Sequence, residues 1–467
     1  MILRWLLLCL LVFASTVARG EFEPSLAIGA ISTDNVTLSS VDPESANVLV
    51  LNPGFTYTRE SESLIADVAY RMDAYHYQER NENEIHNALN AELSFGMVPD
   101  RLFLDLGASR AQAIIDPEGT IPFDNVAITS NWVDRDDFYG GLSFHAPMGE
   151  TIAVNGNLRR TLVRYADQLS AVDGLDDYES DEAGLSLDNY RKGVGVSWAA
   201  RYVFQNVDYN VPPASSYQYQ QAYAELGYWV NPGTRLFVVG GKESPWDVPL
   251  EYGLEDSLWE AGVSRQAGER FRAEFALGDR SFGSSWRGEL EYDFTRGNTE
   301  LSYNETPTTS ANDRFSVGGL LSPEDPDDYL FRAGSAERYI SKRLAWSLDL
   351  EWQRYDIAVA LYDESRDNRT GVNGVQLADE QQSGASLRAA WRLGTRIELS
   401  LSAMRAASEF ASGERHDLAA VAGGASYGLG RRMRLAFELE RRERISAQTP
   451  ALNYSETLGS VILAISF

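Results

Sequence analysis

The chain has almost no cysteine. Cys9 is the only one among 467 residues, and it lies inside an apolar run near the start. The residues before Cys9 do not include the small residue that a lipoprotein cleavage site needs, so we do not expect a lipid anchor. A disulfide framework and a thiolate metal site are excluded for the rest of the chain. We therefore expect a large exported protein that is stable without disulfides, and we predict no metal site and no cofactor.

Basic residues are also scarce. Lys and Arg total 41 against 68 Asp and Glu, and the formal charge is −27. Nucleic-acid binding requires a basic surface, so we predict no nucleic-acid partner. The same charge disfavours docking onto anionic lipid headgroups.

Long apolar runs are missing after residue 20, where no stretch approaches eighteen apolar residues. A transmembrane helix needs a run of about that length, so the sequence predicts none. The remaining way to cross a membrane is by strands that close into a barrel.

The first twenty residues, MILRWLLLCLLVFASTVARG, have the features of a secretory signal peptide. Arg4 supplies a positive charge before the apolar run, and small residues precede residue 21 at the positions that a signal peptidase reads. We predict a signal peptide at 1–20 and one domain at 21–467. The alternative is a buried N-terminal helix.

What recurs in the rest of the sequence is alternation of apolar and polar residues with a period of two, which predicts strands. In one segment the apolar face is Leu64, Ala66, Val68, Tyr70 and Met72, opposite Asp67, Arg71 and Asp73. In a second it is Ile340, Leu344, Trp346, Leu348, Leu350 and Trp352, opposite Arg343, Ser347, Asp349 and Glu351. In a third it is Met433, Leu435, Phe437 and Leu439, opposite Arg434, Glu438, Glu440 and Arg442.

The gaps between these strands alternate in length. Short gaps are expected at 61–63, 99–100, 148–149, 232–233, 267–269, 297–298, 394–395 and residue 430. Long gaps are expected at 33–45, 114–134, 166–186, 244–256, 307–336 and 366–379. Short turns at one end and long loops at the other are typical of outer-membrane barrels.

We therefore predict an all-β fold, a transmembrane antiparallel up-and-down β-barrel of about 22 strands, within a range of about 18 to 24. Its short turns would be periplasmic and its long loops extracellular, in the outer membrane of a Gram-negative cell. The alternative is a soluble β protein with an aromatic core. Aromatic residues near expected strand ends would form the interfacial girdles: Trp132, Phe138, Tyr139, Tyr165, Tyr190, Trp198, Tyr202, Tyr228, Trp229 and Tyr355.

Chemistry-bearing clusters are few. His76 and His86 flank the expected outer loop 78–85, with Asp73 and Glu79 nearby, and this is the best candidate for a surface hydrolase. Histidines in polar loops are usually solvated, so we expect no enzymatic activity and predict no catalytic residues.

The segment 167–188 carries eight acidic residues without a basic one. It lacks the ligand spacing of a calcium loop, so we expect a solvated outer loop.

The polar faces that would line the lumen carry charges of both signs, such as Arg434 with Glu438 and Arg343 with Asp349. A conduit for a strongly anionic polymer is expected to have a lining in which the charges are positive only. The mixed lining therefore favours a neutral or weakly charged solute.

The last segment, NYSETLGSVILAISF, places Val461, Leu463, Ile465 and Phe467 on one strand face and Ser460 and Ser466 on the other. We interpret these four apolar residues as the barrel-insertion signal, read by the outer-membrane insertion machinery and facing lipid. Membrane lipid, lipopolysaccharide and that machinery are the expected partners.

Several stretches, in order, resemble the PEP-CTERM-system-associated family of outer-membrane β-barrel proteins. They are 33–35, IDPEGTIPFDN at 115–125 followed by Asn131, Glu243 after a Val-Val-Gly-Gly strand, LGDRSFGSSWRGELEYDF at 277–294, ERYISKRLAWSLDLEW at 337–352 and ALYDESRD at 360–367. Residues 328–336 look like an insertion.

The resemblance implies a link to exopolysaccharide export or surface assembly, with polysaccharide and periplasmic export proteins as partners. It supplies no mechanism and no catalytic residues. Four functions stay open on the sequence: an exopolysaccharide conduit or its partner, a general porin or solute channel, a barrel hydrolase, and an anchoring barrel whose loops bind the polymer.

Overall fold

The computed structural model describes residues 20–116, 118–149, 151–166, 177–189, 193–210, 217–245, 254–309, 337–370 and 376–467. The predicted signal peptide therefore lies outside the described residues, except for Gly20. No helix in the described part of the chain is long and apolar enough to span a membrane.

Twenty-two strands lie within the described ranges, joined in one sheet. The first eleven are β1 (Glu21–Thr33), β2 (Ala46–Ser61), β3 (Leu64–Tyr77), β4 (Glu82–Val98), β5 (Leu102–Ile114), β6 (Trp132–Met148), β7 (Ile152–Tyr165), β8 (Tyr178–Asn189), β9 (Gly195–Tyr209), β10 (Tyr217–Asn231) and β11 (Thr234–Glu243). The others are β12 (Asp256–Ala267), β13 (Phe271–Arg280), β14 (Gly283–Phe294), β15 (Gly297–Thr309), β16 (Arg338–Glu351), β17 (Tyr355–Thr370), β18 (Glu380–Leu393), β19 (Ile397–Glu409), β20 (Arg415–Gly428), β21 (Met433–Ser446) and β22 (Tyr454–Ser466). One short 3-10 turn, η3 (Pro450–Leu452), precedes β22.

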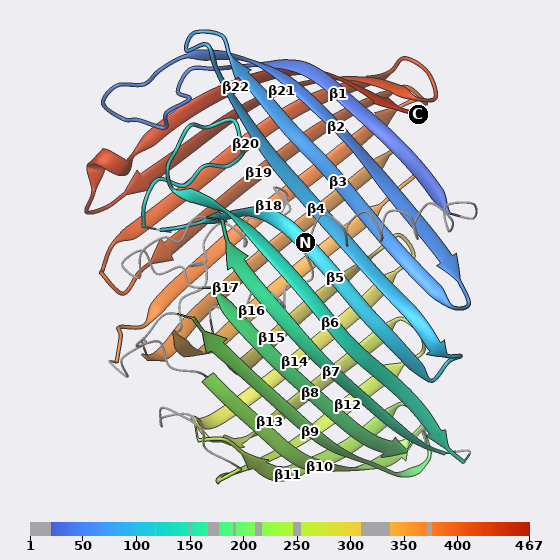
Figure 1. Ribbon diagram of the computed structural model, residues 1–467. Helices are drawn as coiled ribbons and strands as arrows, with labels where there is room; N and C mark the ends of the chain where they lie inside the picture. The colour runs from blue at the N-terminus through green and yellow to red at the C-terminus, as the bar shows by residue number, and fades with distance from the viewer. Residues whose placement is uncertain are drawn as a thin grey trace.

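Each strand pairs antiparallel with its neighbours in sequence, and the sheet closes on itself. β1 pairs with β22 over nine residue pairs, from Ser25 opposite Ser466 to Thr33 opposite Leu458. Figure 1 shows the result, a barrel of strongly tilted strands with β1 and β22 side by side. Closure leaves no unpaired strand edge, which a hydrocarbon environment requires. The predicted fold class and strand number are confirmed.

The connections sort by length as predicted. All ten connections at the end that holds the first residues of β1 are two to five residues long. At the opposite end the connections include 34–45, 115–131, 166–177 and 244–255. Three connections at that end are exceptions, because 78–81, 281–282 and 410–414 are also only two to five residues long. By the rule for outer-membrane barrels the first end is periplasmic and the second extracellular.

Four predicted boundaries are wrong. Residues 297–298 begin β15, and the turn lies at 295–296. The segment 166–186 ends earlier because Tyr178 already pairs with Val163 and Tyr209, and its residues 167–176 lie outside the described part. Strands β15 and β17 extend to Thr309 and Thr370, so the loops predicted at 307–336 and 366–379 are shorter. In each case inter-strand pairing continues through polar residues that sequence alone reads as loop.

The outer surface is apolar. Residues directly opposite each other in an antiparallel ladder point to the same side, so the pairing assigns every strand position to one of the two barrel faces. The exposed large apolar side chains gather on the outward face and include Leu142, Leu158, Leu185, Leu226, Leu277, Leu290, Leu301, Leu401, Val421 and Phe437. These residues form the belt that faces lipid. The predicted faces of the strands beginning at Leu64, Ile340 and Met433 are confirmed by the ladders.

Candidate functional site in the barrel lumen

The β5–β6 hairpin leaves the barrel wall near its extracellular end. The β4–β5 ladder stops at Leu89 opposite Arg110, whereas the β5–β6 ladder continues to Ile114 opposite Trp132. Residues 111–114 therefore pair only with β6. The tip of the hairpin, with the connection 115–131, reaches strands β20 to β22 through the lumen, because its partners there lie on their inward faces.

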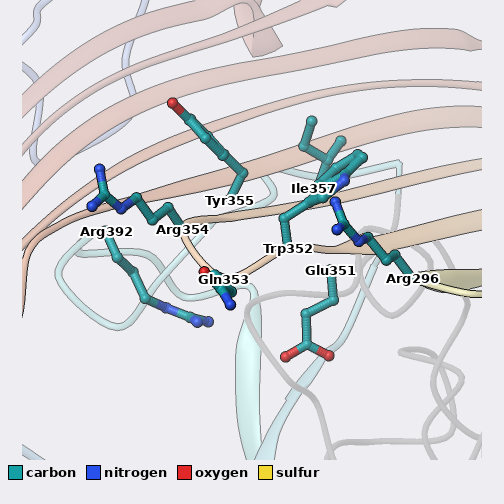
Figure 2. Close-up of a pocket in the computed structure, with 8 residues that line it drawn as sticks. All are labelled: Arg296, Glu351, Trp352, Gln353, Arg354, Tyr355, Ile357 and Arg392. Carbon is teal, nitrogen blue, oxygen red and sulfur yellow. The ribbon is translucent and has the colours of Figure 1, made fainter.

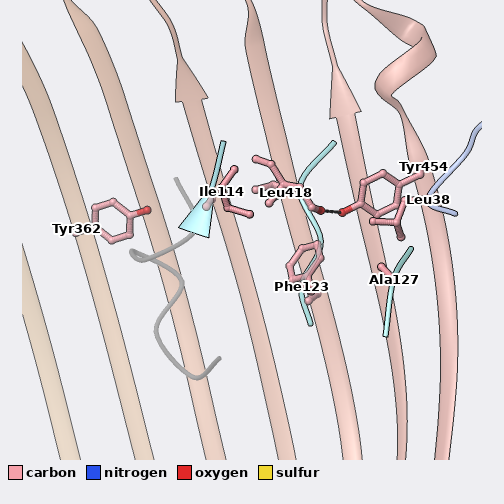
Figure 3. Packing of buried hydrophobic residues seen from close by; sticks show 10 residues of the cluster. Leu38, Ile114, Phe123, Ala127, Tyr362, Leu418 and Tyr454 are labelled. Atoms are coloured by element: carbon pink, nitrogen blue, oxygen red, sulfur yellow. Dashed lines mark hydrogen bonds between the residues drawn. The ribbon is translucent and has the colours of Figure 1, made fainter. Parts of the chain in front are cut away.

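An apolar cluster forms where this connection meets the far wall. Ile121 and Phe123 are buried against Leu418 and Ala420 of β20, with Tyr454 beside them. Figure 3 shows Phe123 and Ala127 lying over the strands that carry Leu418 and Tyr454. Burial of these side chains keeps the connection inside the barrel, since leaving the lumen would expose them to water.

Three polar contacts hold the same segment, and together with the apolar cluster they form what we call the clamp. The Tyr454 hydroxyl donates to the carbonyl oxygen of Ile121 at 2.6 Å. The Arg444 guanidinium donates to the carbonyl oxygens of Glu118, at 2.9 Å, and Gly119. The third contact is the ion pair between Asp124 and Arg442 at 2.8 Å. The Arg442 side chain is only 6 % exposed, so the pair is poorly screened by solvent.

A second connection packs under the first. Val36 and Leu38 of the connection 34–45 are buried, Val36 beside Val126 and Leu38 beside Ala127. The Ile128 amide donates to the Val36 carbonyl at 2.8 Å. The extracellular half of the lumen is thus occupied by segments of the chain itself. The sequence analysis gave only a long gap at 114–134 and did not predict its inward course.

The wall around the lumen carries charges that are paired with the opposite sign. Glu243 is fully buried and accepts hydrogen bonds from Arg280, from the Ser281 amide and from the Tyr219 hydroxyl. Further inward pairs are Arg287 with Glu260 and Glu274, Arg235 with Glu225, Arg135 with Asp137, and Arg366 with Glu364. The mixed lining predicted from the sequence is confirmed, and it also compensates itself locally.

A chamber of about 690 Å³ lies beside the inserted hairpin. Its lining includes the amides of Asn52, Asn90 and Asn125, the aromatic residues Tyr75 and Trp132, and the charged residues Arg71, Asp73, Arg110 and Asp124. The charged residues are held in ion pairs, Arg71 with Asp73, Arg110 with Asp136 and Asp124 with Arg442. Amide groups both donate and accept hydrogen bonds, so the three asparagines suit uncharged polar solutes. The Oδ1 atom of Asn52 is buried and has no hydrogen-bond partner among the described residues.

Glu414, on the connection between β19 and β20, holds the extracellular rim together. Its carboxylate accepts hydrogen bonds from the Ser446 hydroxyl at 2.5 Å, the Gln448 amide at 3.0 Å and the Thr449 hydroxyl at 3.0 Å. Burial alone would raise the pKa of Glu414, but these hydrogen bonds outweigh burial and lower the pKa from its ordinary value of 4.5 to about 2. The carboxylate is therefore ionised at neutral pH and joins two rim connections.

The histidine hypothesis finds no support in the geometry. His76 lies on the outward face of β3 and contacts the Asn83 amide oxygen at 2.9 Å. His86 lies on the inward face of β4 and packs on Trp132 with ring centroids 4.7 Å apart. The two imidazoles thus project from opposite sides of the wall and cannot act together.

Neither of the other two histidines forms a catalytic arrangement. His145 Nδ1 contacts the amide oxygen of Asn155, and the buried His416 contacts Arg444. No group of three or more metal-ligating side chains occurs in the part of the chain that the structure describes.

The predicted aromatic girdle is only partly correct. Phe138, Tyr228 and Tyr355 are exposed on the outward face. Tyr165 is buried inside and Trp132 contacts His86, so neither faces lipid. Trp229 and Tyr139 are also on the inward face, Trp198 and Tyr202 on the outward face, and Tyr190 lies outside the described residues.

The last strand has the geometry that its predicted role requires. Val461, Leu463 and Ile465 lie on the outward face of β22, between β21 and β1. Phe467 is exposed, and its amide donates to the Pro24 carbonyl at 3.0 Å. Whether these residues act as the insertion signal stays a prediction.

Comparison with known proteins gives the fold. No protein-family model matches the chain, and no curated protein matches it in sequence. A mutant of the ferric enterobactin receptor PfeA of Pseudomonas aeruginosa is 10 % identical, with a TM-score of 0.52, over 96 % of this chain and 80 % of that one. The siderophore receptor PirA of the same organism is 11 % identical over 96 % and 80 %, with a TM-score of 0.48. OpdK of Pseudomonas aeruginosa, solved with vanillate, is 11 % identical over 96 % and 99 %, with a TM-score of 0.34.

The closed 22-strand antiparallel barrel, with its apolar belt and polar lumen, defines an outer-membrane β-barrel protein of Gram-negative type. Its barrel is similar to that of the ferric enterobactin receptor PfeA. The resemblance to the PEP-CTERM-associated family is not matched by any family model and stays a prediction.

Proposed function

We propose that this protein is an outer-membrane channel for a hydrophilic solute with little net charge. The observation that carries the proposal is the local pairing of the inward-facing charges, such as Arg287 with Glu260 and Glu274. A lumen whose charges are compensated does not concentrate ions of one sign, so it favours neither anions nor cations. Uncharged polar groups such as Asn52 and Asn90 remain for contacts with the solute.

The clamped connection 115–131 constricts this passage. It crosses the lumen within the extracellular half and is held by side chains of β20 to β22 rather than by a covalent link. A segment that is held by a few hydrogen bonds and an apolar cluster can move without unfolding the wall, since the ladders of the barrel do not depend on it. We therefore propose that solute passage follows rearrangement of this connection.

Two classes of solute fit this proposal, and the first candidate is a small solute. The barrel of the ferric enterobactin receptor PfeA is similar, and this likeness supports a solute channel. Export of an exopolysaccharide is the second candidate, because residues from the stretches that resemble the PEP-CTERM-associated family line the lumen. Asp124, Glu243 and Arg280 all belong to those stretches and all form inward ion pairs.

Reconstitution tests the channel. Purified protein in planar bilayers should show discrete conductance with almost equal permeability for small anions and cations. Proteoliposomes should swell in neutral sugars faster than in charged sugars of equal size. Silence in both assays, including with a variant whose clamp is broken, would overturn the proposal.

A deletion strain then separates the two solutes. Loss of surface polysaccharide with retention of intracellular precursor supports the export channel. Normal surface polysaccharide together with slower uptake of small neutral solutes supports the small-solute channel.

A further inference from the structure

A row of unpaired arginines lies along one part of the periplasmic rim. The exposed side chains are Arg296, Arg354, Arg396, Arg431 and Arg432, on the turns 295–296, 352–354, 394–396 and 429–432. Within the described ranges none of them has a carboxylate within salt-bridge distance. Successive turns are two strands apart, a spacing of about 10 Å. The row therefore spans eight of the 22 strands, from β14 to β21, in a chain whose overall charge is −27.

The remaining periplasmic turns are different. The turn 62–63 carries Glu62, while 99–101 and 268–270 each carry one acid and one arginine, Asp100 with Arg101 and Glu269 with Arg270. Among the turns that the structure describes in full, net positive charge is thus concentrated over β14 to β21. The net negative charge of the whole chain disfavours binding of anionic lipid, but it gives no information about this local basic surface.

A hollow of about 870 Å³ lies within the row at the turn between β16 and β17. Its lining includes three arginines, Arg296, Arg354 and Arg392, one carboxylate, Glu351, and the apolar or aromatic residues Trp352, Tyr355 and Ile357. Figure 2 shows Tyr355 and Ile357 on one side of this turn and Glu351 on the other. Tyr355 also stacks on Trp391 of β18, with centroids 5.8 Å apart, and both rings face outward.

These neighbours fit an amphipathic anion. Outward aromatic and aliphatic groups at the periplasmic boundary of the belt contact acyl chains and glycerol, and aromatic rings prefer this depth. Two guanidinium groups without protein partners offer hydrogen bonds to a phosphate, which arginine binds strongly. An acidic segment of a soluble protein would form ion pairs with the arginines but would not contact the apolar groups beside them.

We propose that this hollow, with the neighbouring rim arginines, binds the phosphodiester headgroup of an anionic phospholipid in the inner leaflet of the outer membrane. The site anchors this part of the barrel to that leaflet. This inference does not depend on what passes through the lumen.

Lipid retention by the folded full-length protein tests the site. The protein in neutral detergent is mixed with equal amounts of phosphatidylglycerol and phosphatidylcholine of identical acyl chains, and bound lipid is counted by native mass spectrometry. We expect phosphatidylglycerol to be preferred, and R296Q/R354Q to weaken its binding about tenfold. Phosphatidylcholine binding should not change.

The matched control is R101Q/R270Q, which removes two exposed arginines from the turns 99–101 and 268–270. Folding of every variant is checked by heat-modifiable migration on gels. Equal loss in both double variants, or no loss in R296Q/R354Q, would overturn the proposal. Binding of hexaglutamate that depends on Arg296 and Arg354, without preference for phosphatidylglycerol, would assign the row to an acidic protein segment and overturn the lipid site.

Discussion

Arg442 Nη2 lies 2.8 Å from Asp124 Oδ2, and this contact joins strand β21 to a connection that starts at the end of β5, six strands away around the barrel. Arg442 also contacts Glu440 at 2.7 Å and Glu456 at 3.5 Å. One guanidinium therefore contacts three carboxylates, two of which belong to the wall and one to the inserted connection. The charge of Asp124 is compensated only while the connection stays inside the lumen.

Asp124→Asn should loosen the clamp, because it removes the charge of the connection and leaves Arg442 with its two wall partners. A hydrogen bond to a charged group contributes about 1.5–3 kcal/mol, so we expect the connection to open at least tenfold more often. Single-channel recording should show higher conductance or longer open times. Asp42→Asn, on the exposed part of the connection 34–45, is the control and should leave conductance unchanged. Identical recordings from the two variants would show that Asp124 does not restrain the passage.

The ion pair of Glu243 and Arg280 should contribute to the stability of the wall. Glu243 has no exposed surface, and Arg280→Met would leave its carboxylate buried without a cation. We expect a loss of about 3–5 kcal/mol in the free energy of unfolding, measured with urea in lipid vesicles. Arg272→Met is the matched control on the same strand, because Arg272 is 62 % exposed and solvent screens its pair with Glu291, so the variant should lose little stability. A similar loss in both variants would contradict the assigned burial.

The strands of the barrel wall are predictable from the sequence, because alternation of apolar and polar residues is a local signal. Alternation in segments such as the one from Met433 to Arg442 assigns each residue to a face, and closure then follows from the number of strands. The inward course of 115–131 has no such signal. Gln112 and Ile114 continue the alternation of β5, although the hairpin has already left β4 at Arg110.

What fixes that course is contact between residues far apart in the chain. Tyr454 and Ile121, which share the hydrogen bond at the far wall, are separated by 333 positions. The buried charges show the same limit. Glu243 and Arg280 lie 37 positions apart in the sequence. Their pairing becomes evident only when β11 and β13 are placed on either side of β12.

Acid should loosen the extracellular rim through Glu414. Its pKa is lowered in the folded protein to about 2, from an ordinary value of 4.5. A lowered pKa means that the carboxylate stabilises the fold fully above pH 4.5, and that this stabilisation is lost as the pH falls towards 2. Amide exchange at Gln448, which donates to Glu414, should accelerate over that interval relative to the wall amides. In Glu414→Gln the exchange should already be fast at neutral pH and should lack this pH dependence. Protection that persists at pH 2 would contradict the assignment.

The outward residues Val461, Leu463, Ile465 and Phe467 provide the last prediction, which concerns assembly. Phe467→Ala should lower the amount of barrel assembled in the outer membrane several-fold, because the insertion machinery is predicted to read this apolar face. The protein that does insert should conduct normally, since Phe467 contacts Pro24 through its backbone amide and takes no part in the clamp. Ser466→Ala, on the inward face of the same strand, is the control and should assemble at the normal level. The ratio of folded to unfolded protein on unheated gels measures assembly. An undiminished ratio in Phe467→Ala would remove the insertion role from this face, while the pairing of β22 with β1 would still account for closure of the barrel.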